Sequence, residues 1–190
     1  MTRYVAFLRA INVAGHARVE MSRLCDVFAR AGCVNAQTYI QSGNVIFETE
    51  DDDCAELFQK IRTNVCRLTG EQSSVMFRSA RQIKALVNAA PFKAFDADRT
   101  VKLYAVCLLE KPRSVPPFPW EDSKERLEAI GIKGLDVLVV SRRKPSGFYG
   151  FPNSFVEKKL GVQATSRNWS TIRKIEEILK VERLKVKVGK

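Results

Sequence analysis

Apolar residues in the first 80 positions alternate between the spacing typical of strands and the three-to-four spacing typical of helices. The run 4–8 is continuously apolar, as expected for a central strand that is covered on both faces. Helices are predicted at 21–31 and between Asp53 and Gly70, and further strands at 39–41, 44–47 and 74–78. The predicted order is β-α-β-β-α-β, which is the ferredoxin-like arrangement.

The segment 39–47 lies at the centre of this pattern. Its two ends are rich in β-branched and aromatic residues, and Ser42-Gly43 separates them, which predicts a tight hairpin. Gly43 suits such a turn because glycine adopts a positive φ at little steric cost. In a ferredoxin-like sheet, strand 44–47 lies antiparallel between the first two strands.

The second half predicts a similar order of elements. Ser79 and Gln82 have capping-box spacing, which predicts a connecting helix that ends before Pro91. Strands are predicted at 101–109, 136–141, 147–151 and 184–188, and helices at 123–130, 154–160 (opened by a second capping box, Ser154 to Glu157) and 168–180. We therefore predict an α+β protein of two tandem ferredoxin-like units with antiparallel or mixed sheets. These units are residues 1–78 and 101–190, and residues 79–100 form the connecting helix and loop.

The net charge of +11 is unevenly distributed along the chain. Residues 1–80 hold nine basic and nine acidic residues, so residues 81–190 carry the whole excess. A basic half indicates an anionic partner, such as nucleic acid, an acidic protein or a phosphorylated small molecule. The alternative is that these side chains only solvate the surface.

The remaining composition narrows the classes of function. Five scattered cysteines without zinc-ligand spacing indicate buried thiols in a reducing compartment. The single histidine, His16, has no accompanying ligand cluster, so no metal site is predicted. No phosphate-binding glycine loop, dinucleotide fingerprint or nucleophile elbow occurs, and we predict no cofactor. Without a secretory signal or an apolar run of membrane-spanning length, we expect a cytoplasmic protein with no membrane partner.

Three separated segments carry a family resemblance: 4–13, 38–45 and 155–169. In these segments the chain resembles a bacterial family of uncharacterised proteins, the domain of unknown function 1697. The resemblance implies the fold and a bacterial, cytosolic context, but it brings no activity and no catalytic residues. Ala14 departs from the pattern, because relatives carry a second glycine there, which implies a stiffer first loop.

The main candidate site consists of basic and helix-capping residues in the second half. Its members are Arg142, Arg143, Lys158, Lys159, Arg167 and Asn168. The N–H groups at the start of a helix can bind an anion, and Asn168 precedes the last predicted helix. The alternatives are a solvated loop tip at 142–144 and a well-capped helix with Trp169 in the core.

A second candidate site follows from the predicted topology. The carboxyl ends of the first two strands meet the start of strand 44–47 at one edge of the sheet. This edge gathers Arg9, Asn12, Gln41, Ser42 and Asn44, with His16 nearby. Such a set of guanidinium, amide and backbone N–H groups suits a carboxylate or phosphate. Alternatively, Ser42 to Asn44 serve the turn and Arg9 pairs with an acid or a carbonyl.

Two further interpretations concern the sheets. RNA-recognition modules stack bases on aromatic residues of central strands, a part that Phe7 and Phe47 would play here. Residues 43–47 lack the basic and aromatic signature of those modules, so both rings are expected in the core. The second interpretation is a homo-oligomer that forms through exposed sheet faces.

We predict a non-catalytic protein that binds an anionic partner, nucleic acid or a phosphorylated ligand, through its basic C-terminal half. The alternative is an enzyme or sensor that binds a small acidic ligand at the Arg9 edge.

Overall fold

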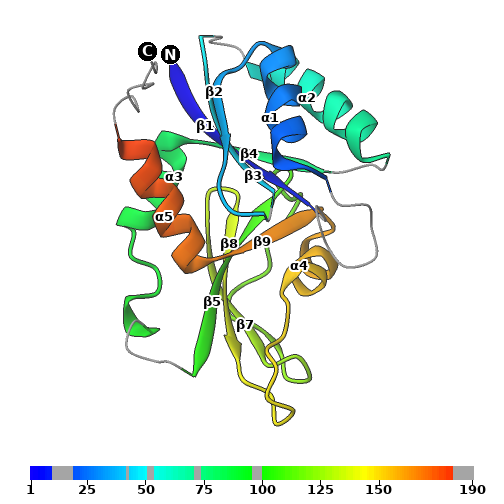
Figure 1. Cartoon of the computed structure of the whole chain (residues 1–190). Coiled ribbons are helices and arrows are strands. Elements are labelled where there is room, and N and C mark those ends of the chain that lie inside the picture. The colour runs from blue at the N-terminus through cyan, green and yellow to red at the C-terminus, as the bar shows by residue number, and fades with distance from the viewer. Residues whose placement is uncertain (10–18, 42, 51–53, 71–73, 96–99, 182–190) are drawn as a thin grey trace.

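The computed structural model describes residues 1–9, 19–41, 43–50, 54–70, 74–95 and 100–181. In this part of the chain, nine strands form two antiparallel sheets and five α-helices pack against them (Figure 1). The first half contains β1 (Thr2–Leu8), α1 (Met21–Ala31), β2 (Val34–Thr38), β3 (Asn44–Thr49), α2 (Cys54–Thr69) and β4 (Val75–Ser79). The second half contains α3 (Ala80–Asn88), a 3-10 helix (Lys93–Phe95), β5 (Val101–Leu108), β6 (Trp120–Asp122), β7 (Leu127–Lys133), β8 (Asp136–Arg142), α4 (Asn153–Leu160), β9 (Ala164–Asn168) and α5 (Trp169–Lys180).

The first sheet has the strand order β2-β3-β1-β4, so β3 lies between β1 and β2 as predicted. The apolar run of β1 is buried on both faces, because Val5 to Leu8 point alternately to the two sides of a central strand. Helices α1 and α2 cover one face (Figure 1). The predicted α+β class and the order of elements in the first half are confirmed.

The hairpin between β2 and β3 is longer than predicted. Strand β2 ends at Thr38 and β3 begins at Asn44, so Tyr39, Ile40, Gln41 and Gly43 lie in the connection. Ile40 has a φ of 53°, which an extended strand does not allow, so the predicted strand at 39–41 is wrong. Gly43 has the expected positive φ of 70°, and the Tyr39 N–H donates to the Asn44 carbonyl at 3.0 Å. Ser42 lies outside the described residues.

The second sheet has the strand order β6-β7-β8-β5-β9 and differs from the prediction. The predicted helix at 123–130 is wrong: from Leu127 onward the chain is strand β7, which pairs with β8 through a turn that contains Gly134. Buried Leu127 and Ala129 alternate with more exposed neighbours, which is the period of a strand. No helix separates β5 from the next strand, so the second half is not a β-α-β-β-α-β unit.

Three other boundaries in the second half also differ. Residues 147–151 form no strand but a single bridge between Arg143 and Tyr149. Helix α4 begins at Asn153 after Pro152 and has no capping box, because the Glu157 carboxylate accepts from the Ala164 N–H instead. Residues 164–168 form strand β9 rather than a cap alone, and they pair with β5. The predicted strand at 184–188 lies outside the described residues.

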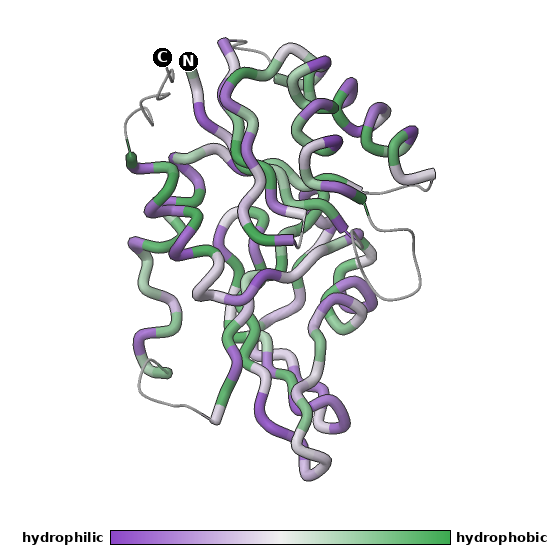
Figure 2. The backbone as a smooth tube through the Cα atoms, in the orientation of Figure 1, coloured by the Kyte–Doolittle hydropathy of each residue, from purple (hydrophilic) through white to green (hydrophobic). Residues whose placement is uncertain are grey.

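The central core lies between the two sheets, where helices α3 and α5 pack against both. Its buried members are Val5, Phe7, Ile46, Met76, Ile83, Leu86, Phe92, Ala105, Cys107, Leu138, Val140, Trp169, Ile172, Ile175 and Leu179. Separate clusters fill the far face of each sheet, so in the described ranges neither sheet offers a bare apolar face. Oligomerisation through exposed sheet faces therefore has no support. Figure 2 shows hydrophilic and hydrophobic positions alternating along the helices, which is the expected pattern for one buried face.

Two further structural facts concern the described residues. The capping box at Ser79 and Gln82 is present, and it starts α3 directly at the end of β4. None of the helices in the described ranges combines the length and the apolar character that crossing a bilayer requires. The division into units 1–78, 79–100 and 101–190 stays a prediction.

Candidate functional site

Arg167 lies inside the protein and not on its surface. It is 7% exposed, because strand β9 directs its side chain toward the first sheet. Its guanidinium donates to the Asn44 side chain and to the carbonyls of Leu8 and Gly43. The ring of Phe7 lies 5.3 Å from the guanidinium carbon. Arg167 therefore joins the two sheets, and it is not accessible to a partner at the surface.

Burial also changes the ionisation of Arg167. Desolvation lowers the pKa of its guanidinium to about 10, which is well below its ordinary value. The acceptors described above are amide and carbonyl oxygens, which stabilise the charge less than a carboxylate would. Trp169 is likewise buried, and its ring packs against Phe92 with centroids 5.1 Å apart. The expected alternative for this segment, Trp169 in the core, is confirmed.

Two residues of the Arg9 edge, Arg9 and Asn44, make contacts within the chain. The Arg9 side chain turns to the second half, where it bonds the Glu157 carboxylate at 3.1 Å and the Ala164 carbonyl at 3.2 Å. Asn44 is fully buried, and its amide nitrogen donates to the Tyr39 carbonyl. Gln41 is exposed at the hairpin. Asn12, His16 and Ser42 lie outside the described residues. The predicted proximity of β1 and the hairpin holds, since the Leu8 N–H donates to the Gly43 carbonyl.

Lys158 and Lys159 extend from α4 into solvent. Both line an open pocket of about 680 Å³, which lies between α4 and the turn from β6 to β7. Among the described residues, neither lysine has a hydrogen-bond or ion-pair partner. Lys124 and the acidic residues Glu121, Asp122 and Glu125 line the opposite wall. The charged residues on the α4 wall are therefore both basic, and those on the opposite wall are of mixed charge.

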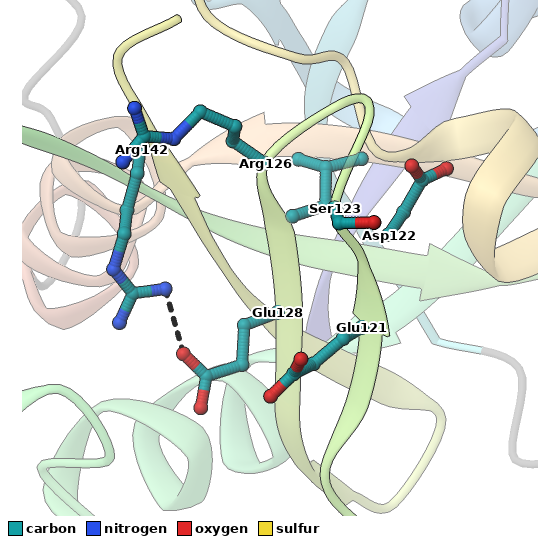
Figure 3. Close-up of a pocket in the computed structure, with 7 residues that line it drawn as sticks. Glu121, Asp122, Ser123, Arg126, Glu128 and Arg142 are labelled. Carbon is teal, nitrogen blue, oxygen red and sulfur yellow. Dashed lines mark hydrogen bonds and ion pairs between the residues drawn. The ribbon is translucent and has the colours of Figure 1, made fainter.

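Arg142 and Arg143 differ in their partners, since Arg142 pairs with a carboxylate and Arg143 bonds only a backbone carbonyl among the contacts described. Arg142 donates to Glu128 at 2.7 Å, beside a pocket of about 370 Å³ (Figure 3). Glu121 and Glu128 are direct cross-strand partners in this pocket, whose lining holds three acidic residues against two arginines. Arg143 is exposed, and its Nε donates to the Gly147 carbonyl at 3.1 Å. Of this pair, Arg143 is the better candidate for a surface anion. Asn168 is exposed, and its side chain does not cap α5.

The segment 143–151 adds exposed aromatic residues that the sequence reading missed. Phe148 is 75% exposed and Phe151 is 62% exposed. Phe151 lines the same pocket as Lys158 and Lys159. The repeat of glycine and aromatic residues at 147–151 is a signal for this segment, but it is also typical of a strand, which the sequence predicts here. By contrast, Phe7 and Phe47 are fully buried, as expected, and cannot serve as a stacking platform.

A third pocket lies on the first half, between α1 and α2. It measures about 480 Å³ and is lined by Arg23, Asp26, Val27, Arg30, Asn64, Arg67 and Leu68. This basic groove was also missed, because the balanced charge of residues 1–80 hides a local excess of arginine. Within the described ranges, no three histidine, cysteine, aspartate or glutamate side chains come together as metal ligands would.

Fold and site together define an α+β protein with two antiparallel sheets, a shared core and exposed cations on its C-terminal half. The chain belongs to the family described as protein of unknown function DUF1697, whose model matches residues 1–137. A solved structure, that of conserved bacterial protein SP0830 from Streptococcus pneumoniae, is similar with a TM-score of 0.66 and 22% sequence identity. The match covers 94% of this chain and 99% of that chain, and at this identity it shows the fold alone. No curated protein matches the sequence.

Proposed function

We propose that the protein binds a phosphate-bearing partner, with nucleic acid the best-fitting class, and performs no chemistry of its own. We assign the phosphate contacts to three exposed cations, Lys158 and Lys159 on α4 and Arg143 at the turn with Gly147, and we call these residues together the basic surface. The observation that carries this proposal is the exposure of Lys158 and Lys159, which have no acceptor among the described residues. Neighbouring cations such as Arg142 and Lys144 are already paired with carboxylates.

The chemistry of these side chains favours contacts with phosphate over base recognition. Lysine is a compact charge on a flexible stem, so it attracts phosphate without fixing a sequence. Glu121 and Asp122 on the opposite wall repel an anion. The phosphates are therefore expected along α4 and not in the middle of the pocket.

Charge reversal tests this proposal. The double variant Lys158→Glu/Lys159→Glu should weaken binding of a labelled mixed-sequence oligonucleotide about tenfold at low salt, since two phosphate contacts become repulsive. Fluorescence anisotropy measures the affinity, and circular dichroism checks the fold. The matched control, Arg23→Glu/Arg67→Glu, makes the same charge change in the groove between α1 and α2.

The control separates local binding from overall charge. We expect the arginine variant to retain most of the affinity. If both double variants weaken binding equally, only the net charge matters, and the proposed surface is wrong.

A further inference from the structure

We infer that the partner is bound as a single strand, with unpaired bases stacked on Phe148 and Phe151. This inference rests on the proposed function, because the basic surface would hold the phosphates of the same strand. It adds a stacking site, which explains why two large apolar rings are exposed to solvent.

The exposure of these rings is unusual for this chain. Most of its other phenylalanines in the described ranges are buried or partly covered within the clusters between and around the sheets. Phe148 and Phe151 expose 75% and 62% of their surface. Phe151 makes an edge contact with the ring of Tyr104, at a centroid distance of 6.2 Å. Exposed rings beside cations are the combination that single-stranded nucleic-acid sites use.

Local hydrogen bonds hold this segment in one shape. The Lys144 N–H donates to the Phe148 carbonyl at 2.8 Å, and the Gly147 N–H donates to the Lys144 carbonyl at 2.9 Å. Gly147 has a φ of 85°, which suits glycine. The side chain of Arg143 braces the same turn through its bond to the Gly147 carbonyl. Phe148 is therefore presented on an ordered turn, which lowers the entropy cost of binding.

The positions of the rings fit one continuous strand. Three residues of extended chain span at most about 11 Å, so Phe148 and Phe151 can serve nearby nucleotides. Phe151 shares its pocket with Lys158 and Lys159. Lys102 lies 4.6 Å from the ring centre of Tyr149, which adds a cation beside the same segment. In a duplex the faces of the bases are hidden. Its phosphates could therefore contact the lysines, but its bases could not stack on the phenylalanine rings.

Three probes of equal length test the inference: a single-stranded oligonucleotide, the corresponding duplex, and an abasic phosphodiester chain. The wild-type protein should bind the single strand at least about fivefold more tightly than the abasic chain, because stacking adds to each base contact. Phe148→Ala/Phe151→Ala should remove this preference and leave affinity for the abasic chain unchanged. Phe148→Trp/Phe151→Trp should keep it, since tryptophan also stacks.

The outcomes distinguish the two proposals. Equal binding of all three probes, unaffected by the alanine variant, overturns the stacking site and leaves the phosphate-binding function standing. Failure of all three probes to bind at low salt overturns both. Binding to vesicles of anionic phospholipid that depends on Phe148 and Phe151, without oligonucleotide binding, would show that the rings insert into lipid and would also overturn the inference.

Discussion

Two buried arginines, Arg78 and Arg167, link the two sheets at the residue scale. Arg78 in β4 donates to both carboxylate oxygens of Asp136 in β8, each at 3.1 Å. Burial by itself lowers the pKa of Arg78, but Asp136 outweighs that effect and the pKa is raised. The Arg78 guanidinium therefore stays charged inside the core. Cys107 lies beside it and is fully buried.

Breaking the Arg78–Asp136 pair should destabilise the protein strongly. Arg78→Met leaves the Asp136 carboxylate buried without its partner, and we expect a loss of about 3–5 kcal/mol in the free energy of unfolding. The double variant Arg78→Met/Asp136→Leu should recover a large part of this loss, because no buried charge remains. Urea denaturation of the wild type, of the single variants Arg78→Met and Asp136→Leu, and of the double variant gives the coupling energy. If the two single losses simply add in the double variant, the pair does not act as a unit.

The stability of the protein should fall at alkaline pH because of Cys107. Burial, reinforced by Asp136, raises the pKa of the Cys107 thiol above its ordinary value of 9.0. The unfolded chain therefore releases this proton first, so the stabilisation is fully present below pH 9.0 and is lost as pH rises above it. Relative to Cys107→Ala, the wild type should lose about 1.4 kcal/mol between pH 8 and pH 10. A stability difference that does not change with pH would contradict the raised pKa.

At the scale of elements, the sequence predicts the helices and strands that are determined by residues close together in the chain. The apolar run of β1 and the capping box of α3 both depend on near neighbours, and both are found. Strand β9 could not be predicted, because its polar residues 165–168 are typical of a helix cap. They are satisfied by long-range contacts, such as the bond from Arg167 to the Leu8 carbonyl. Leu127 begins a strand instead of a helix because β8 offers it a partner.

The shape of the turn at 144–148 should control access to the exposed rings. Gly147→Val forces a β-branched residue into the left-handed region, at a cost of about 1–2 kcal/mol or more, so the turn should open. We expect weaker binding of the single-stranded probe and faster hydrogen exchange at 143–151, with unchanged protection in the sheets. Gly134→Val places the same strain at a φ of 62° in the turn between β7 and β8 and should leave binding unchanged. Equal effects of both variants would mean that general destabilisation, and not this turn, is responsible.

At the scale of the whole molecule, both halves of the chain build the core, whereas only the second half carries the excess positive charge. The first sheet, α3 and α5 contribute to one core with the second sheet. The excess charge of +11 belongs to residues 81–190. The match to the family model covers residues 1–137, so the basic surface and the exposed rings lie beyond the matched region. The charge imbalance could be predicted from the sequence, but the burial of Arg167 and the exposure of Phe148 depend on the complete fold.

Binding of a labelled single-stranded oligonucleotide across a salt series tests the central claim most directly. We predict a linear fall of log affinity with log salt, with a slope of about −0.7 for each neutralised phosphate. In Lys158→Glu/Lys159→Glu the slope should be shallower by about 1.4, because two such contacts are removed. Affinity that does not respond to salt, or no binding at low salt, would contradict the account of the C-terminal half as a phosphate-binding surface.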